Sequence, residues 1–192
     1  MDARPHIAAL VVRSTDAVTA DYRVRSAVAA DLVYVPELER AAAIAFEPWG
    51  LAQAFAAETI DSRELELAIV EQRLLIAAED NDIPVGFAFI TTVEGQPHLE
   101  ELDVAPEHGR RGIGSRLVEA VCVAAKAQGS TRVTLSTMRD VPFNAPFYAR
   151  LGFEVIEEEA ATSGLRALRD DERARGLDVL PRVLMMRRLD LD

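Results

Sequence analysis

A glycine-rich turn between a predicted strand and a predicted helix constrains this chain more than any other feature of its sequence. Residues 98–104 have the length of a strand, and apolar residues recur at helical spacing from Gly112 to about Gln128. Successive N–H groups that converge at a helix N-terminus bind anions. The sequence therefore predicts a phosphate or pyrophosphate site in the turn, made by Gly109, Arg110, Arg111, Gly112, Ile113, Gly114 and Ser115.

Two common phosphate-binding motifs do not fit this turn. A Walker loop needs a Gly-Lys-Ser/Thr sequence, and the only lysine of the chain is Lys126. A dinucleotide fingerprint needs a third glycine where Leu117 stands. The turn instead resembles the pyrophosphate loop of the GNAT superfamily of acetyl-CoA-dependent N-acetyltransferases, Arg/Gln-x-x-Gly-x-Gly/Ala. The sequence departs from that pattern at Gly109, which removes one side-chain contact and leaves the backbone amides in place.

A second segment, residues 144–153, is similar to the later Asn…Tyr…Leu-Gly-Phe segment of the same family. Its residues are those of a short helix: Asn144 suits the N-cap, Pro146 suits the first turn, and Gly152 can end the helix in a left-handed conformation. The two motifs occur in the family's order, so together they strengthen the resemblance.

The resemblance implies an α/β GNAT fold over residues 21–192. Its central sheet is expected to be mixed, mostly antiparallel and splayed between the fourth and fifth strands, with helices on both faces. Residues 1–20 are predicted to be a mobile N-terminal extension. Further strands are predicted at 22–27, 74–79, 84–92, 133–137, 153–157 and 182–189, helices at 30–46 and 49–58, and a polar connection at 163–176.

Composition narrows the class of partner. The formal net charge of −11 argues against nucleic acid or an anionic membrane as a partner. No apolar run is long enough to cross a bilayer, and the single Cys122 cannot form an internal disulfide. We expect a cytoplasmic protein without a metal ion, and a homodimer is one assembly compatible with the sequence.

The resemblance also implies roles for individual residues. The backbone of Leu102 and Val104 would face acetyl-CoA, and Tyr148 would supply a proton to the departing thiolate, since a phenol can donate at neutral pH. Asn144 would contact the cofactor, cap its own helix, or do both. Glu100 stands where several relatives carry the base that deprotonates the amine; the alternative is a carboxylate that only attracts a cationic substrate.

The acceptor site is less well defined by the sequence. The resemblance places it near Phe46, Glu47, Trp49 and Arg139, although Trp49 could be a core residue and Arg139 could simply pair with Asp140. The resulting hypothesis is an N-acetyltransferase that acts on a primary amine, in particular that of a small molecule. The alternatives are a protein N-terminal or lysine acetyltransferase and a non-catalytic acyl-CoA-binding sensor.

Overall fold

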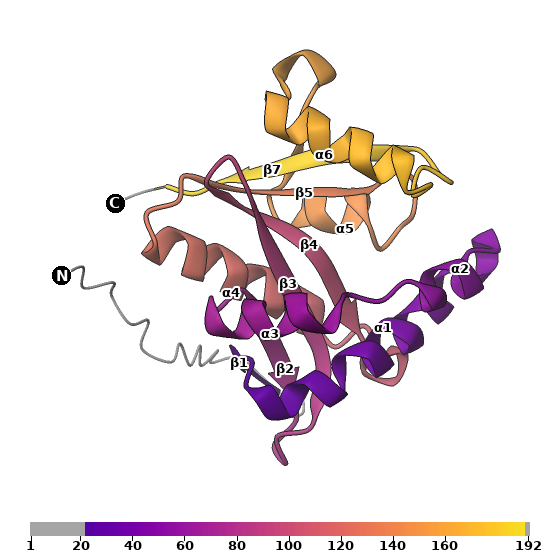
Figure 1. The fold of residues 1–192 in the computed structure, drawn as a ribbon, viewed down its shortest axis with the longest axis vertical. Helices are drawn as coiled ribbons and strands as arrows, with labels where there is room; N and C mark the ends of the chain where they lie inside the picture. Colours follow the sequence, from indigo (N-terminus) through magenta and orange to yellow (C-terminus); the bar gives the residue numbers. More distant parts are fainter. Residues whose placement is uncertain (1–21, 191–192) are drawn as a thin grey trace. The chain divides into compact units, whose positions relative to one another are not determined.

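The computed structural model describes residues 22–190, and its strands form a seven-stranded sheet in the order β1-β2-β3-β4-β5-β7-β6 (Figure 1). The pairs β1–β2, β2–β3, β5–β7 and β6–β7 are antiparallel, and β4–β5 is parallel. The strands are β1 (Arg23–Ser26), β2 (Leu74–Ala78), β3 (Pro84–Val93), β4 (Gln96–Val104), β5 (Arg132–Met138), β6 (Glu154–Val155) and β7 (Arg182–Arg188). The predicted mixed, mostly antiparallel sheet is confirmed, and the predicted extension at residues 1–20 lies outside the described residues.

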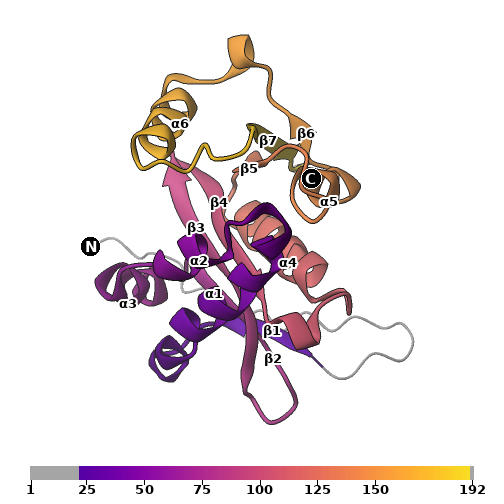
Figure 2. The same cartoon turned by 90° about the vertical axis from the view of Figure 1, so that its right-hand side faces the viewer.

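The chain divides into two compact units, which are described separately here. Unit 1 comprises residues up to 89 together with 101–121, and unit 2 comprises residues 90–100 together with those from 122 onward. In unit 1, α1 and α3 lie on one face of β2 and β3, and the first part of α4 lies on the other face (Figure 2). The α-helices that begin in this unit are α1 (Val35–Ala43), α2 (Ala52–Ala57), α3 (Ser62–Val70) and α4 (Ile113–Ala127).

The core of unit 1 is built on the inward-facing positions of β2 and β3. Leu74, Ile76, Phe87 and Phe89 are fully buried there, as expected for alternating positions of strands covered by helices. The other members of this cluster are Ala27, Val35, Leu38, Leu65, Ala68, Ala78 and Ala105.

The segment predicted as one helix at 30–46 forms three shorter pieces. A 3-10 helix, η1 (Ala29–Val33), precedes α1, and a second one, η2 (Ile44–Trp49), follows it. Pro36 lies in the first turn of α1, where its missing N–H costs nothing. Gly50 then ends η2 with a φ of +70°. The sequence analysis missed α3, in which only Leu65 and Ala68 are buried among charged residues.

Unit 2 contains two helices, α5 (Ala145–Arg150) and α6 (Ser163–Ala174), and a 3-10 turn, η4 (Glu158–Ala160). The interpretation of 163–176 as a plain connection was wrong, because α6 begins at an N-cap where the Leu165 N–H donates to Thr162 Oγ1 at 3.4 Å. Leu165 then packs against Leu184 of β7. Asn144 does occupy the N-cap position of α5, but its side chain makes no capping hydrogen bond.

The end of β4 packs tightly against β3 within unit 1. The Ala105 N–H donates to the Val85 carbonyl at 2.9 Å. A Cβ at Gly86 would lie 2.7 Å from the Asp103 carbonyl oxygen, so only glycine allows this approach. Alternation along a strand places the side chains of Leu102 and Val104 on one face of β4 and those of Glu101 and Asp103 on the other.

Candidate active site

The turn before α4 has a backbone that few sequences can adopt. Gly112 has a φ of +78°, and Arg110, which carries a side chain, has a φ of +58°. A left-handed residue other than glycine costs about 1 kcal/mol or more, and such strain is typical of ligand-binding turns. The structure thus confirms that the chain turns sharply at the residues predicted to hold a phosphate.

The amides at the start of α4 are the groups of this turn that are expected to attract an anion. The first helical hydrogen bond of α4 runs from the Arg116 N–H to the Gly112 carbonyl, at 3.1 Å. The N–H groups of the preceding three residues, Ile113, Gly114 and Ser115, therefore belong to the first turn of a helix that is fifteen residues long. Such groups attract negative charge. The Gly109 N–H, in contrast, donates to the Pro106 carbonyl at 3.0 Å, within η3 (Pro106–His108).

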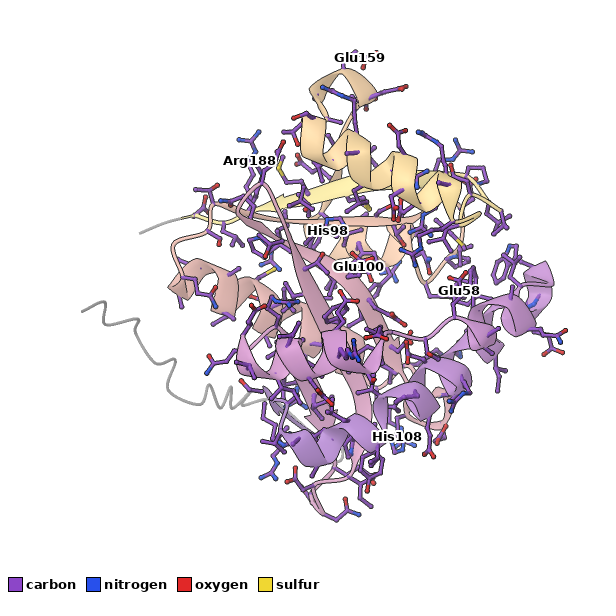
Figure 3. The ribbon with its side chains drawn as sticks, viewed as in Figure 1. Glu58, His98, Glu100, His108, Glu159 and Arg188 are labelled. Atoms are coloured by element: carbon purple, nitrogen blue, oxygen red, sulfur yellow. The ribbon has the colours of Figure 1, made fainter. Side chains whose placement is uncertain are left out.

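Arg111 has a structural partner that the sequence did not reveal. Its Nη1 donates to the hydroxyl oxygen of Tyr22 at 2.8 Å, and that oxygen lies 2.9 Å from Nδ1 of His108, which is labelled in Figure 3. The rings of Tyr22 and His108 also meet edge to face, with centroids 5.7 Å apart. Because Tyr22 is only 3% exposed, these contacts tie the turn to the residue that precedes β1.

Unit 2 carries the other residues expected to act on the cofactor. Tyr148 lies in α5, with its ring centroid 5.1 Å from that of Phe147 and 5.8 Å from that of Phe153. The main-chain carbonyl of Asn144 accepts from the N–H groups of Phe147 and Tyr148, at 2.8 and 3.1 Å. Gly152 ends this segment with a φ of +82°, as predicted. Glu100 is exposed on β4 and accepts a hydrogen bond from the Thr91 hydroxyl at 3.2 Å (Figure 3).

The residues expected at the acceptor site occur in both units. In unit 1, the Phe46 ring lies 4.8 Å from Phe55 and 6.5 Å from Trp49, and Glu47 is exposed. Trp49 is 37% exposed, so the alternative that it is a core residue is wrong. In unit 2, Arg139 pairs with Asp140 at 3.0 Å on the surface. This is the ion pair that the sequence offered as the alternative to a role in acceptor binding.

Comparison with known proteins identifies the family. The model of the acetyltransferase (GNAT) domain matches residues 32–169, which is more than half of the chain. The chain belongs to the GNAT acetyltransferases. Its assignment as an enzyme of the acetyltransferase class follows from that membership.

Solved GNAT structures have the same fold at low sequence identity. The PaiA N-acetyltransferase of Thermoplasma acidophilum, solved with coenzyme A, is 17% identical with a TM-score of 0.67, over 88% of this chain and 99% of that one. The N-acetylglutamate synthase of Neisseria gonorrhoeae, solved with coenzyme A and N-acetyl-glutamate, is 22% identical with a TM-score of 0.66, over 91% of this chain and 36% of that longer one. The ribosomal-protein-S18-alanine N-acetyltransferase of Escherichia coli is 16% identical with a TM-score of 0.60, over 90% of this chain and 96% of that one. Identities this low establish the fold and leave the acceptor open.

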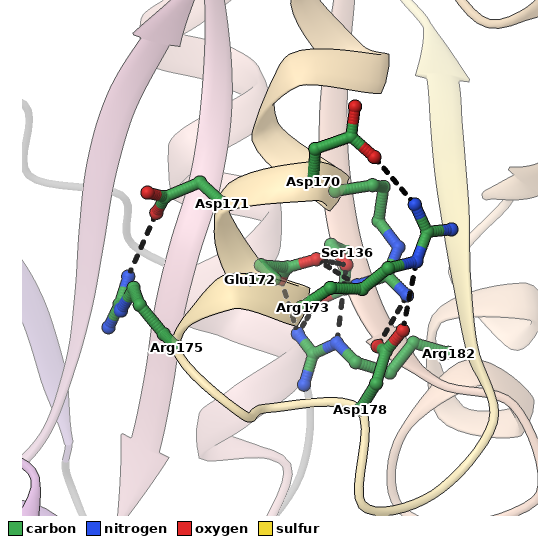
Figure 4. A network of polar contacts seen from close by, with 9 residues as sticks. Ser136, Asp170, Asp171, Glu172, Arg173, Arg175, Asp178 and Arg182 are labelled. Carbon is green, nitrogen blue, oxygen red and sulfur yellow. Dashed lines mark hydrogen bonds and ion pairs between the residues drawn. The ribbon is translucent and has the colours of Figure 1, made fainter.

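This GNAT acetyltransferase also carries a buried ionic network in unit 2, which joins α6 to β5 and β7 (Figure 4). Glu172 accepts from the Ser136 hydroxyl at 2.8 Å, from Arg182 at 2.8 Å, and from Arg169. Arg169 in turn pairs with Asp178. Removing one partner of such a network leaves an uncompensated buried charge, so the network holds α6 in place.

His98 lies close to this network and is 2% exposed. Its Nδ1 is 2.9 Å from the Thr134 hydroxyl. Burial lowers the pKa of His98 to about 4; the nearby Glu172 opposes this effect and Arg182 adds to it. A buried neutral imidazole in this position pairs β4 with β5 and has a structural role.

Two features are absent from residues 22–190. In that range no group of three or more His, Cys, Asp or Glu side chains is arranged to hold a metal ion. No membrane-spanning helix is found over the same residues.

Proposed function

We propose that this GNAT acetyltransferase transfers the acetyl group of acetyl-CoA to a primary amine, and that the acceptor is a small molecule. The observation that carries the proposal is the turn before α4, where left-handed Arg110 and Gly112 lead into the amides of a long helix. This geometry suits a diphosphate, which carries negative charge and accepts several hydrogen bonds.

The residues present fit coenzyme A along one strand and one turn of unit 1. The amides from Arg110 to Ser115 would bind the diphosphate, with the Arg110 side chain beside them. The backbone of Leu102 and Val104 would follow the pantetheine arm, as an extended ligand pairs with a strand. The similar structures of PaiA N-acetyltransferase and N-acetylglutamate synthase both contain coenzyme A, which supports coenzyme A as the ligand.

The chemistry then divides among a few groups. Acetyl-CoA supplies an acetyl thioester, which an uncharged amine can attack. Tyr148 would donate its phenolic proton to the departing sulfur, and Asn144 would contact the cofactor. Glu100 remains the sequence-based candidate for receiving a proton from the amine, and Phe46, Glu47, Trp49 and Arg139 remain the candidates for contacting the acceptor.

Two measurements test the proposal. Calorimetry should detect binding of acetyl-CoA, and a screen of small primary amines should detect release of free coenzyme A. Release with peptides alone would indicate a protein acetyltransferase. Binding without release for any acceptor would indicate a non-catalytic acyl-CoA sensor, and absence of binding would contradict the proposal as a whole.

The role of Tyr148 has its own prediction. Tyr148→Phe removes the proton donor and keeps the ring, so turnover should fall by about a hundredfold while the dissociation constant for acetyl-CoA changes little. Steady-state kinetics and calorimetry measure the two quantities. Tyr34→Phe, which removes a hydroxyl from unit 1, is the control and should leave both unchanged. Equal losses of turnover and affinity in Tyr148→Phe would show that Tyr148 only binds.

A further inference from the structure

Two arginines of unit 2 face each other where β5 begins and β7 ends. Arg132 and Arg188, the latter labelled in Figure 3, are directly opposite in the antiparallel register of the two strands. The Leu189 N–H donates to the Thr131 carbonyl at 2.8 Å, so residues 131 and 189 form a hydrogen-bonded pair. In an antiparallel ladder such pairs alternate with non-hydrogen-bonded pairs, whose side chains are closer together. The side chains of Arg132 and Arg188 therefore start from neighbouring points on one face of the sheet.

Neither of these two guanidinium groups is neutralised by a direct contact. Within residues 22–190, the side chains of Arg132 and Arg188 make no hydrogen bond and no ion pair. Like charges that lie directly opposite each other in a sheet repel and destabilise it. The two strands thus hold together a pair of positive charges that a bound anion would neutralise.

Glu94 is a carboxylate that Arg132 influences, but it is already bound at the start of α6. Its Oε1 accepts the Gly164 N–H at 2.8 Å and the Ser163 hydroxyl at 3.1 Å. Among the groups that lower the pKa of Glu94, the Thr162 hydroxyl has the largest effect and the charge of Arg132 the smallest. Glu94 therefore serves as a cap for α6 and leaves the guanidinium group of Arg132 available.

The two arginines line a hollow of about 470 Å³ in unit 2. Small-molecule sites have volumes of about 300 to 1,000 Å³ and combine apolar surface with a few polar groups. Met186 and Leu189 supply the apolar surface here, and Asp190 is an acidic residue that pairs with neither arginine among the described residues. The lining as a whole has one net positive charge; its residues are Thr131, Arg132, Met186, Arg188, Leu189 and Asp190.

We propose that Arg132 and Arg188 bind the carboxylate group of a small organic acid. The planar guanidinium group matches a carboxylate and can donate two parallel hydrogen bonds to it. The apolar part of the acid contacts Met186 and Leu189, and the single net positive charge favours a monoanion over a phosphate dianion. None of these residues is among those proposed to bind coenzyme A or the acceptor. The inference therefore goes beyond the proposed function and does not depend on it.

Calorimetric titration with sodium hexanoate tests the site, at about pH 7, where a carboxylic acid is ionised. Hexanamide has the same length of chain without the charge, and inorganic phosphate is an anion without an apolar chain. We expect hexanoate to bind more tightly than either of them. Equal binding of hexanoate and hexanamide, or no binding of hexanoate, would overturn the proposal. Tighter binding of phosphate would overturn the assignment to a carboxylate.

Substitution of each arginine shows whether hexanoate binds at this hollow. Arg132→Gln and Arg188→Gln should each weaken its binding about tenfold or more, as the loss of a charged hydrogen bond does. Arg63→Gln makes the same change at an exposed arginine of α3, in unit 1, and should bind hexanoate as the wild type does. Wild-type affinity in either Arg132→Gln or Arg188→Gln would contradict a site made by the pair.

Thermal unfolding without ligand tests the repulsion from which the site is inferred. Arg188→Gln and Arg63→Gln change the net charge equally, but only Arg188→Gln separates the facing charges. At low salt its melting temperature should exceed that of Arg63→Gln by about 1–2 °C, and added NaCl should reduce the difference. Saturating hexanoate should reverse the order, because Arg63→Gln keeps both arginines of the site. A lower melting temperature of Arg188→Gln at low salt without ligand would overturn the proposal.

Discussion

At the scale of single residues, the backbone angles of the turn before α4 decide whether it can bind a diphosphate. Gly112 has a φ of +78°, and a Cβ added there would meet no atom within 4 Å. A side chain would therefore fit in the space around residue 112, and the reason for glycine is the left-handed backbone conformation. Replacing Gly112 by alanine therefore tests the effect of backbone strain without steric obstruction.

Gly112→Ala should weaken binding of acetyl-CoA and lower the free energy of unfolding by about 1 kcal/mol. Calorimetry and urea denaturation measure these two effects. Gly176→Ala is a matched control, because Gly176 has a φ of +79° and equally open surroundings but lies after α6 in unit 2. It should lose similar stability and keep the wild-type affinity; a parallel loss of affinity would show that Gly112 acts only through stability.

At the scale of elements, contacts far apart in sequence fix the position of the turn. Tyr22 precedes β1, His108 lies in η3 and Arg111 lies in the turn itself. The Tyr22 hydroxyl accepts from Arg111 and can at the same time donate to Nδ1 of His108. Arg111 is thereby committed to holding the turn, and this leaves Arg110 as the arginine of the pair whose side chain is proposed to lie beside the diphosphate.

Tyr22→Phe should raise the KM for acetyl-CoA severalfold and change kcat little, because it loosens the turn and leaves the reacting groups in place. The loss of one hydrogen bond to a charged group corresponds to about 1.5 kcal/mol or more. Steady-state kinetics measure this split. Tyr34→Phe removes a hydroxyl from another tyrosine of unit 1 and should be silent. If kcat in Tyr22→Phe fell by the same factor as KM rises, this result would argue against a positioning role.

At the scale of the whole molecule, a buried histidine and a half-buried aspartate make stability depend on pH in opposite directions. The pKa of His98 is lowered to about 4, so acidification below its ordinary value of 6.5 favours the unfolded state, which binds the proton. Burial raises the pKa of Asp103 from 3.8 to about 7, so the native state holds a proton that the unfolded state has lost. Its stabilising contribution is complete below about 4 and disappears as the pH rises through about 7.

Asp103→Asn should therefore gain stability relative to the wild type as the pH rises from about 4 to about 7. The gain should not exceed about 1.4 kcal/mol per pH unit, and the hydrogen bond with Glu101, which lowers the pKa of Asp103, limits it further. Urea denaturation at a series of pH values measures the difference. Asp80→Asn makes the same change at an exposed aspartate of unit 1 and should follow the wild type throughout. If the difference in the free energy of unfolding between Asp103→Asn and the wild type were the same at every pH, a raised pKa of Asp103 would be contradicted.

The sequence by itself determined those elements whose conformation depends on residues close together in the chain. The glycines of the turn, the apolar period of α4 and the pair Pro146 and Gly152 around α5 specify backbone conformations within a few residues, so these features were predicted correctly. The family resemblance followed from them, and the family match agrees with it. A cytoplasmic location and a homodimer stay predictions.

Only the tertiary structure decided the features that depend on distant partners. Arg169 and Glu172 belong to the stretch 163–176, which the sequence analysis interpreted as a polar connection. They are buried because each finds an opposite charge, and α6 was missed for that reason. Glu39 likewise has an ordinary place in a helical pattern, and its orphaned oxygen becomes visible only when α1 packs onto the sheet. Local conformational preference depends on neighbouring residues in the chain, whereas burial and charge pairing depend on which segments the fold brings together.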